Sequence, residues 1–125
     1  MTDTITRIVI ACYRPHPGKE EVLLSEVRDH HPLLRSEGLA TDRRPVLMRA
    51  ADGTLIEIFE WASPAAIQEA HENARVQEMW ERFAKCCDYV PLGGLSEAGS
   101  VFSEFEAVRI GFPPLPEVDP DHREE

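Results

Sequence analysis

The chain has 125 residues, 42% of them hydrophobic, which is the size and apolar content of one globular domain. Its 13 lysines and arginines against 23 aspartates and glutamates give a formal net charge of −10, which argues against nucleic acid and anionic membranes as partners, because both attract basic surfaces. No segment has the apolar length of a signal peptide or a membrane span, and the three cysteines imply no disulfide framework, so we expect a reducing, cytoplasmic location.

The first predicted elements are a strand over residues 7–13 and a helix that begins at Lys19. The strand is apolar on both faces, which is typical of a strand covered on both sides. Apolar residues recur along the helix at intervals of three and four. Pro32 is expected to kink or end this helix near His31, with a short further turn to Ser36.

A β-hairpin is predicted where residues 45–51 and 54–61 flank Asp52-Gly53. A two-residue turn places Ala51 opposite Thr54, and Met48 then faces Glu57. In this register Met48, Leu55, Glu57, Phe59 and Trp61 share one face of the sheet, while Leu47, Arg49, Ile56, Ile58 and Glu60 share the other.

A helical region is predicted after Ser63-Pro64, which has the N-cap and first-turn residues of a helix start. The apolar pattern slips near Asn73-Ala74, so we expect a break between two helical stretches there. The second stretch runs to Cys87.

The remainder is predicted to be a loop over 88–100 and a last strand over 101–110. From Gly111 onward prolines and acidic residues dominate, which favours an unstructured tail. The expected organisation is therefore one domain, residues 1–110, followed by an acidic tail, residues 111–125.

The element order β-α-β-β-α-β predicts an α+β fold, ferredoxin-like, with a four-stranded antiparallel sheet and helices on one face. The other face of the sheet is also largely apolar and needs a cover. A second copy of the chain is the simplest cover, so we expect a homodimer.

Five residues are candidates for a small-molecule site. His71 could relay a proton to a ligand oxygen, or cap its helix. Glu57, among apolar neighbours, could act as a base, or form a salt bridge at an interface. Trp61, Trp80 and Tyr13 could line a cavity for an aromatic ligand, or simply belong to the core.

No metal or cofactor site is expected. His30 and His31 are adjacent and therefore point to different helix faces, without a partner at metal-binding spacing, so we interpret them as solvated or half-buried. Nucleotide, flavin and zinc motifs are not found in the sequence. Cys12 and Cys87 are interpreted as small buried residues.

Residues 57–83, EIFEWASPAAIQEAHENARVQEMWERF, resemble the antibiotic-biosynthesis-monooxygenase-like group of the dimeric α/β-barrel superfamily. The features that carry the resemblance are Glu60-Trp61-x-Ser63, His71-x-Asn73 and Val76-x-x-x-Trp80. It extends over roughly residues 7–109. It implies a homodimer, a dimeric α/β barrel with two sheets packed face to face, and a cavity between each sheet and its helices.

Members of this group carry out different chemistries. Some oxidise aromatic polyketides or quinols without metal or flavin, and others degrade haem. The Asn, Trp and His positions of the haem-degrading branch fall near Ala11, on Ala70 and on Trp80, so the residues of that branch are absent here.

Three hypotheses therefore stay open. The chain is a cofactor-independent monooxygenase or isomerase acting on an aromatic or quinone-like compound, or a non-catalytic ligand-binding dimer, or a structural homodimer with a filled cavity.

Overall fold

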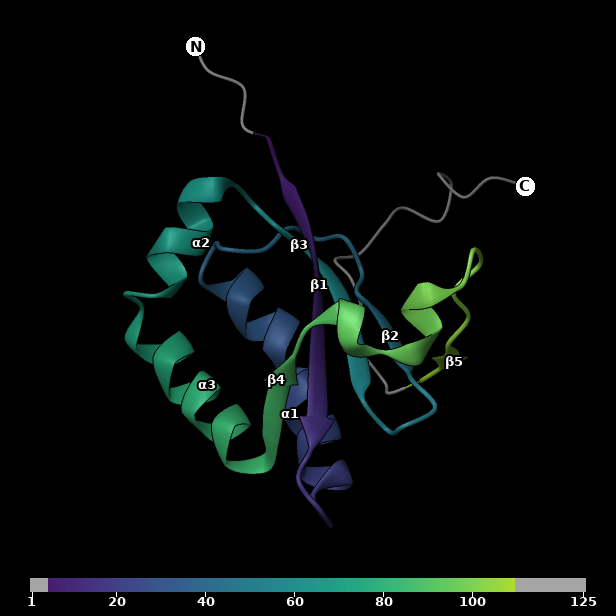
Figure 1. The fold of residues 1–125 in the computed structure, drawn as a ribbon. Coiled ribbons are helices and arrows are strands. Elements are labelled where there is room, and N and C mark those ends of the chain that lie inside the picture. The colour runs from purple at the N-terminus through teal and green to yellow at the C-terminus, as the bar shows by residue number, and fades with distance from the viewer. Residues whose placement is uncertain (1–4, 110–125) are drawn as a thin grey trace, which may run out of the picture.

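The computed structural model describes residues 5–109. This part is an α+β fold with three α-helices and a five-stranded antiparallel sheet of order β4-β1-β3-β2-β5 (Figure 1). The strands are β1 (Arg7–Pro15), β2 (Val46–Arg49), β3 (Leu55–Trp61), β4 (Cys87–Val90) and β5 (Glu106–Ala107). The helices are α1 (Glu20–Ser36), α2 (Pro64–Ala70) and α3 (Ala74–Cys86), and the short 3-10 helices η1 (Leu92–Gly94) and η2 (Ser96–Gly99) follow β4.

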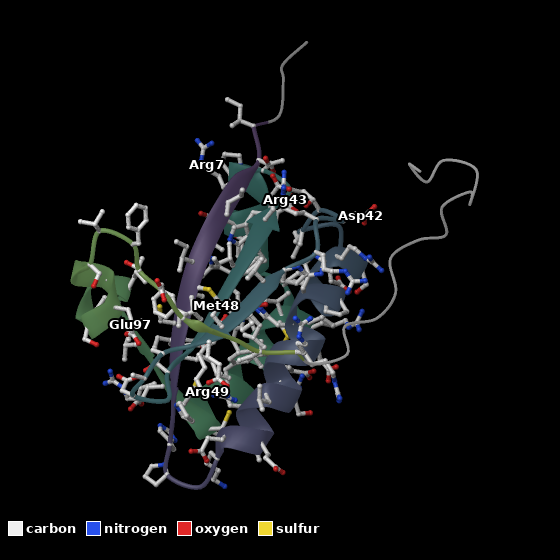
Figure 2. The ribbon with its side chains drawn as sticks, turned by 90° about the vertical axis from the view of Figure 1, so that its right-hand side faces the viewer. Arg7, Asp42, Arg43, Met48, Arg49 and Glu97 are labelled. Carbon is white, nitrogen blue, oxygen red and sulfur yellow. The ribbon has the colours of Figure 1, made fainter. Side chains whose placement is uncertain are left out.

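The sheet separates two apolar clusters. On one face, called the inner face here, strand residues such as Phe59 pack against all three helices. On the opposite, outer face, a smaller cluster forms where Leu95 covers Cys12 and Ile56. Figure 2 shows the same layers from the side, with Glu97 of η2 and helix α1 on opposite sides of the strands. Each face of the sheet therefore has a different cover, and the outer cover is only partial.

The local signals for helix starts are confirmed. The backbone N–H of Ala66 donates to Ser63 Oγ (3.0 Å), which caps α2. The predicted break lies between α2 and α3, where Asn73 Oδ1 accepts from the N–H of Val76 (3.1 Å). These caps stabilise the ends of two consecutive helices that would otherwise leave donors unpaired.

The predicted hairpin exists, but its predicted register is wrong by one residue. Ala50 N–H donates to the Thr54 carbonyl (2.8 Å), so the loop has three residues, and Leu47 rather than Met48 pairs with Glu57. The reason is local: Asp52 Oδ1 accepts from the Thr54 N–H, and Gly53 adopts φ +94°, which favours glycine. The shift moves Met48 to the outer face and brings Leu47 to the inner face.

The predicted end of the sheet is also corrected. The fourth strand is β4, which follows α3 directly and pairs with β1. It begins at Cys87, the expected end of the preceding helix, and continues into the segment expected to be a loop. Of the strand expected over 101–110, only β5 forms in the described part, and it pairs with β2 as a fifth strand. The four-stranded prediction missed β4 because four residues followed by Pro91 carry too short a pattern. The predicted tail, 111–125, lies outside the described residues.

Helix α1 continues through Pro32 to Ser36, so the helix does not end at this proline. Proline removes one helical hydrogen bond. The next turn is nevertheless held in place because Leu34 is fully buried against the core. Tertiary packing thus outweighs the local signal.

Within residues 5–109, none of the helices is both long enough and apolar enough to cross a membrane.

Candidate functional site

A cavity of about 290 Å³ lies between the inner face of the sheet and the helices. Strands β1, β3 and β4 form one wall, and α1, α3 and the end of α2 form the other, an arrangement that can be followed in Figure 1. Six of its lining side chains are aromatic rings, and no described lining residue is a lysine or arginine. The cavity is lined by Val9, Ala11, Tyr13, His30, Phe59, Trp61, His71, Trp80, Phe83 and Tyr89.

A chain of hydrogen bonds forms the polar part behind this wall. Tyr13 Oη donates to Glu57 Oε1 (2.7 Å), and His30 Nδ1 lies 2.9 Å from the same oxygen. Trp80 Nε1 donates to His30 Nε2 (3.2 Å). Glu57 is 0% exposed. One buried carboxylate therefore joins strands β1 and β3 to helices α1 and α3.

The proton positions in this chain follow from the donor inventory. The indole nitrogen of Trp80 can only donate, so His30 Nε2 must accept. A neutral His30 then carries its proton on Nδ1 and donates it to Glu57. Glu57 accepts from both partners, which is the pattern of an ionised carboxylate.

Two tyrosines of the site stay protonated at neutral pH. Burial, and then the neighbouring Glu57 carboxylate, raise the pKa of Tyr13 well above its ordinary value. Burial raises the pKa of Tyr89 to about 12. Both hydroxyls are therefore hydrogen-bonding groups rather than bases.

His71 lies at the exposed end of the cavity, at the C-terminal cap of α2. Its Nδ1 lies 2.9 Å from the Ile67 carbonyl, so this nitrogen donates and Nε2 carries the lone pair of a neutral ring. Its ring lies edge-on to Trp80, with centroids 5.3 Å apart. His71 thus has the helix-capping contact of its structural interpretation and also a nitrogen that can exchange a proton.

The structure brings four of the five predicted site residues to one cavity. Tyr13, Trp61, His71 and Trp80 line it, whereas Glu57 lies behind Tyr13 and His30 and is not among the described lining residues. Trp61 is also part of the core, in contact with Phe59 at 5.1 Å between ring centroids. The core and cavity interpretations of these aromatics therefore hold together.

Sequence reasoning missed His30 as a site residue. The interpretation of His30 and His31 as solvated or half-buried is wrong, since they are 3% and 4% exposed. They do point in different directions, because His31 Nε2 donates to the Thr41 carbonyl (2.8 Å) instead. The available signal was the position of His30 on the apolar stripe of α1, which requires a buried polar partner.

Glu60 forms a second carboxylate cluster, on the outer side of β3. It accepts from Thr6 Oγ1 (2.6 Å), Thr41 Oγ1 (2.8 Å) and Arg43 Nε (2.9 Å). These hydrogen bonds hold the pKa of Glu60 down to about 2. Figure 2 shows Arg43 near Arg7, at the end of the molecule where β1 begins. This cluster ties the start of β1 to the segment after α1 and is separate from the cavity.

Residues 5–109 contain no group of three or more His, Cys, Asp or Glu side chains that could hold a metal ion. Comparison with protein-family models, with characterised proteins and with solved structures finds no match.

Proposed function

We propose that this protein binds a small aromatic or quinone-like compound in the cavity between its sheet and helices. The observation that carries the proposal is the lining: six aromatic rings enclose about 290 Å³ with few polar groups, which is typical of sites for apolar ligands. The volume lies at the small end for ligand sites and suits one or two fused rings.

The proposed chemistry is proton exchange between the ligand and His71. If His71 Nε2 takes the proton of a ligand hydroxyl, the ligand becomes an electron-rich anion. Molecular oxygen as co-substrate could then oxidise a phenol to a quinone, with one oxygen atom entering the ring and the other leaving as water. An isomerase would instead return the proton to a different ligand atom. Both reactions fit a cofactor-independent monooxygenase or isomerase.

Non-catalytic ligand binding is the second candidate. It is favoured by the state of Glu57, whose carboxylate is already occupied by Tyr13 and His30 and offers no free base to the cavity. In this case the aromatic lining retains a ligand and His71 only caps α2. A structural homodimer without ligand is less well supported, because the rings do not fill the cavity.

We also propose the ferredoxin-like topology and the antibiotic-biosynthesis-monooxygenase-like family for this chain. The order β4-β1-β3-β2, in which two β-α-β halves interleave within an antiparallel sheet, supports the topology. The family proposal depends on the resemblance of residues 57–83 to that group.

The proposed partner is a second copy of the chain on the outer face of the sheet. Ile10, Ile58 and Val46 form one row across three strands there, and Ile10 and Val46 are 45% and 50% exposed. Leu95 and its neighbours cover only the adjacent part of this face. A homodimer of the barrel type would bury the open row.

Sedimentation velocity tests the dimer. Ile10→Glu is expected to convert a dimer to a monomer, whereas Val22→Glu, at an exposed apolar site on α1, should leave the dimer intact. A monomeric native protein would refute the proposed assembly.

Native mass spectrometry of the isolated protein is the first test of the cavity. A reproducible increase in mass from a bound small molecule supports ligand binding and provides a compound for turnover assays. Ala11→Phe, which fills the cavity, should abolish the increment, while Val22→Phe on α1 should retain it. With a substrate in hand, His71→Ala should abolish turnover without loss of the fold. Retained turnover would exclude His71 from the mechanism.

A further inference from the structure

Tyr13 lines the cavity, and its hydroxyl group is oriented by Glu57, which lies behind the cavity wall. Its single proton points to Glu57 Oε1 at 2.7 Å, the shortest bond of the buried chain. The opposite side of this oxygen carries lone pairs. A tyrosine in this state can accept a hydrogen bond from the cavity but has no proton left to donate to it.

The surroundings of Glu57 keep it in the accepting state. Tyr13 on β1 and His30 on α1 both donate to it, and the described residues that contact it supply no competing acceptor. The other titratable groups nearby include His31 on α1, Cys87 at the start of β4, and Tyr89 on β4, whose ring lies 5.8 Å from that of Tyr13. Because Trp80 holds His30 as the Nδ1–H form, His30 cannot reverse the direction of the chain.

We propose that Glu57 is a positioning residue that determines which class of ligand the cavity binds. Glu57 orients the hydroxyl of Tyr13, so that the inner wall of the cavity accepts a hydrogen bond from the ligand. The cavity therefore selects a compound with a hydroxyl donor over the matching ether or ketone. This inference rests on the proposed function, since it concerns the compound bound in the same cavity. An aromatic ligand should therefore bind in its phenol or enol form, rather than its quinone form, with the hydroxyl group at the end of the cavity where Tyr13 lies.

The substitution Glu57→Leu should abolish this preference, whereas Glu57→Gln should retain it. Tyr13 and His30 both donate to the same oxygen of Glu57, so an amide oxygen at this position still accepts from both. The leucine side chain offers no acceptor, so in Glu57→Leu the Tyr13 hydroxyl is free to turn its proton toward the cavity and to donate there. A purely structural role of Glu57 would weaken binding of all ligands alike and would leave the ratio of their affinities unchanged.

The test is calorimetric titration with 1-naphthol and with 1-methoxynaphthalene, which have the same rings but differ in the donor. The native protein should bind the naphthol about three- to tenfold more tightly, the range expected for one neutral hydrogen bond. Tyr13→Phe and Glu57→Leu should bind the two probes equally, and Glu57→Gln should keep the preference for the naphthol. Circular dichroism and thermal unfolding establish the fold of each variant before titration, and Tyr13→Phe suffices if Glu57→Leu does not fold.

The outcomes separate this inference from the proposed function. If both probes bind equally to the native protein, or the ether binds more tightly, the cavity binds aromatics but the assignment to Tyr13 and Glu57 is overturned. An unchanged naphthol preference in Tyr13→Phe overturns it as well. If neither probe binds the native protein, the proposed function fails, and the inference fails with it.

Discussion

At the scale of single residues, the buried chain through Glu57 is the feature that links stability to the site. A carboxylate with no exposed surface is tolerated because Tyr13 and His30 replace the hydrogen bonds that it would make with water. The same two side chains reach the cavity wall. Changes at Glu57 should therefore affect folding and ligand selection together.

Removing this carboxylate should be costly. Glu57→Ala leaves two buried donors unpaired as well as a cavity, and we expect a loss of about 3 kcal/mol or more in the free energy of unfolding. Tyr13→Phe removes one hydrogen bond but leaves Glu57 bound to His30, so its loss should be about 1–2 kcal/mol. Urea denaturation measures both. Equal losses in the two variants would contradict the central position of Glu57.

Glu60 gives a prediction for acid stability. Its pKa is lowered from 4.5 to about 2 in the folded protein by hydrogen bonds from Thr6, Thr41 and Arg43. Its contribution to stability is therefore complete above pH 4.5 and is lost as the pH falls from 4.5 toward 2. Glu60→Gln should be less stable than the native protein at pH 7, and the difference should shrink over this range. Melting temperatures measured from pH 7 to pH 2 test this, and a constant difference would exclude the assigned role.

At the scale of elements, helix termini were predictable because their signals are local. A serine before a proline specifies the start of α2 without any information on the rest of the fold. The hairpin was only partly predictable, since Asp52-Gly53 marks the turn but does not fix whether two or three residues form it. β4 was not predictable from its four residues, because its pairing with β1 defines it as a strand.

The cap of α2 can be tested directly. Ser63→Ala removes the acceptor for the Ala66 N–H and should lower the free energy of unfolding by about 1 kcal/mol. Ser25→Ala, at an exposed position inside α1, serves as the matched control and should change stability by a few tenths of a kcal/mol at most. Chemical denaturation of both variants makes the comparison. A similar small effect in both would show that the cap contributes little.

At the scale of the whole molecule, burial controls cysteine reactivity. Cys12, Cys86 and Cys87 are free and buried. Burial raises the pKa of Cys87 to about 12 and also raises the pKa of the other two thiols, so little thiolate is present at neutral pH. The folded protein should react with a disulfide reagent far more slowly than the urea-unfolded chain, in which all three thiols react. Rapid reaction of the folded protein would mean that the core opens readily.

The sequence alone determined the α+β class, the order of the first elements, the hairpin position and the helix starts, because residues close together in the chain decide each of these. It also singled out Tyr13, Trp61, His71 and Trp80, which the structure brings to one cavity. Only the tertiary structure decided the register of β2, the identity of β4 and the pairing of Glu57 with His30. Glu57 and His30 are 27 residues apart, and Glu57 and Tyr13 are 44 apart. No local pattern specifies which buried donor meets which buried acceptor, since packing of the helices on the inner face makes that choice.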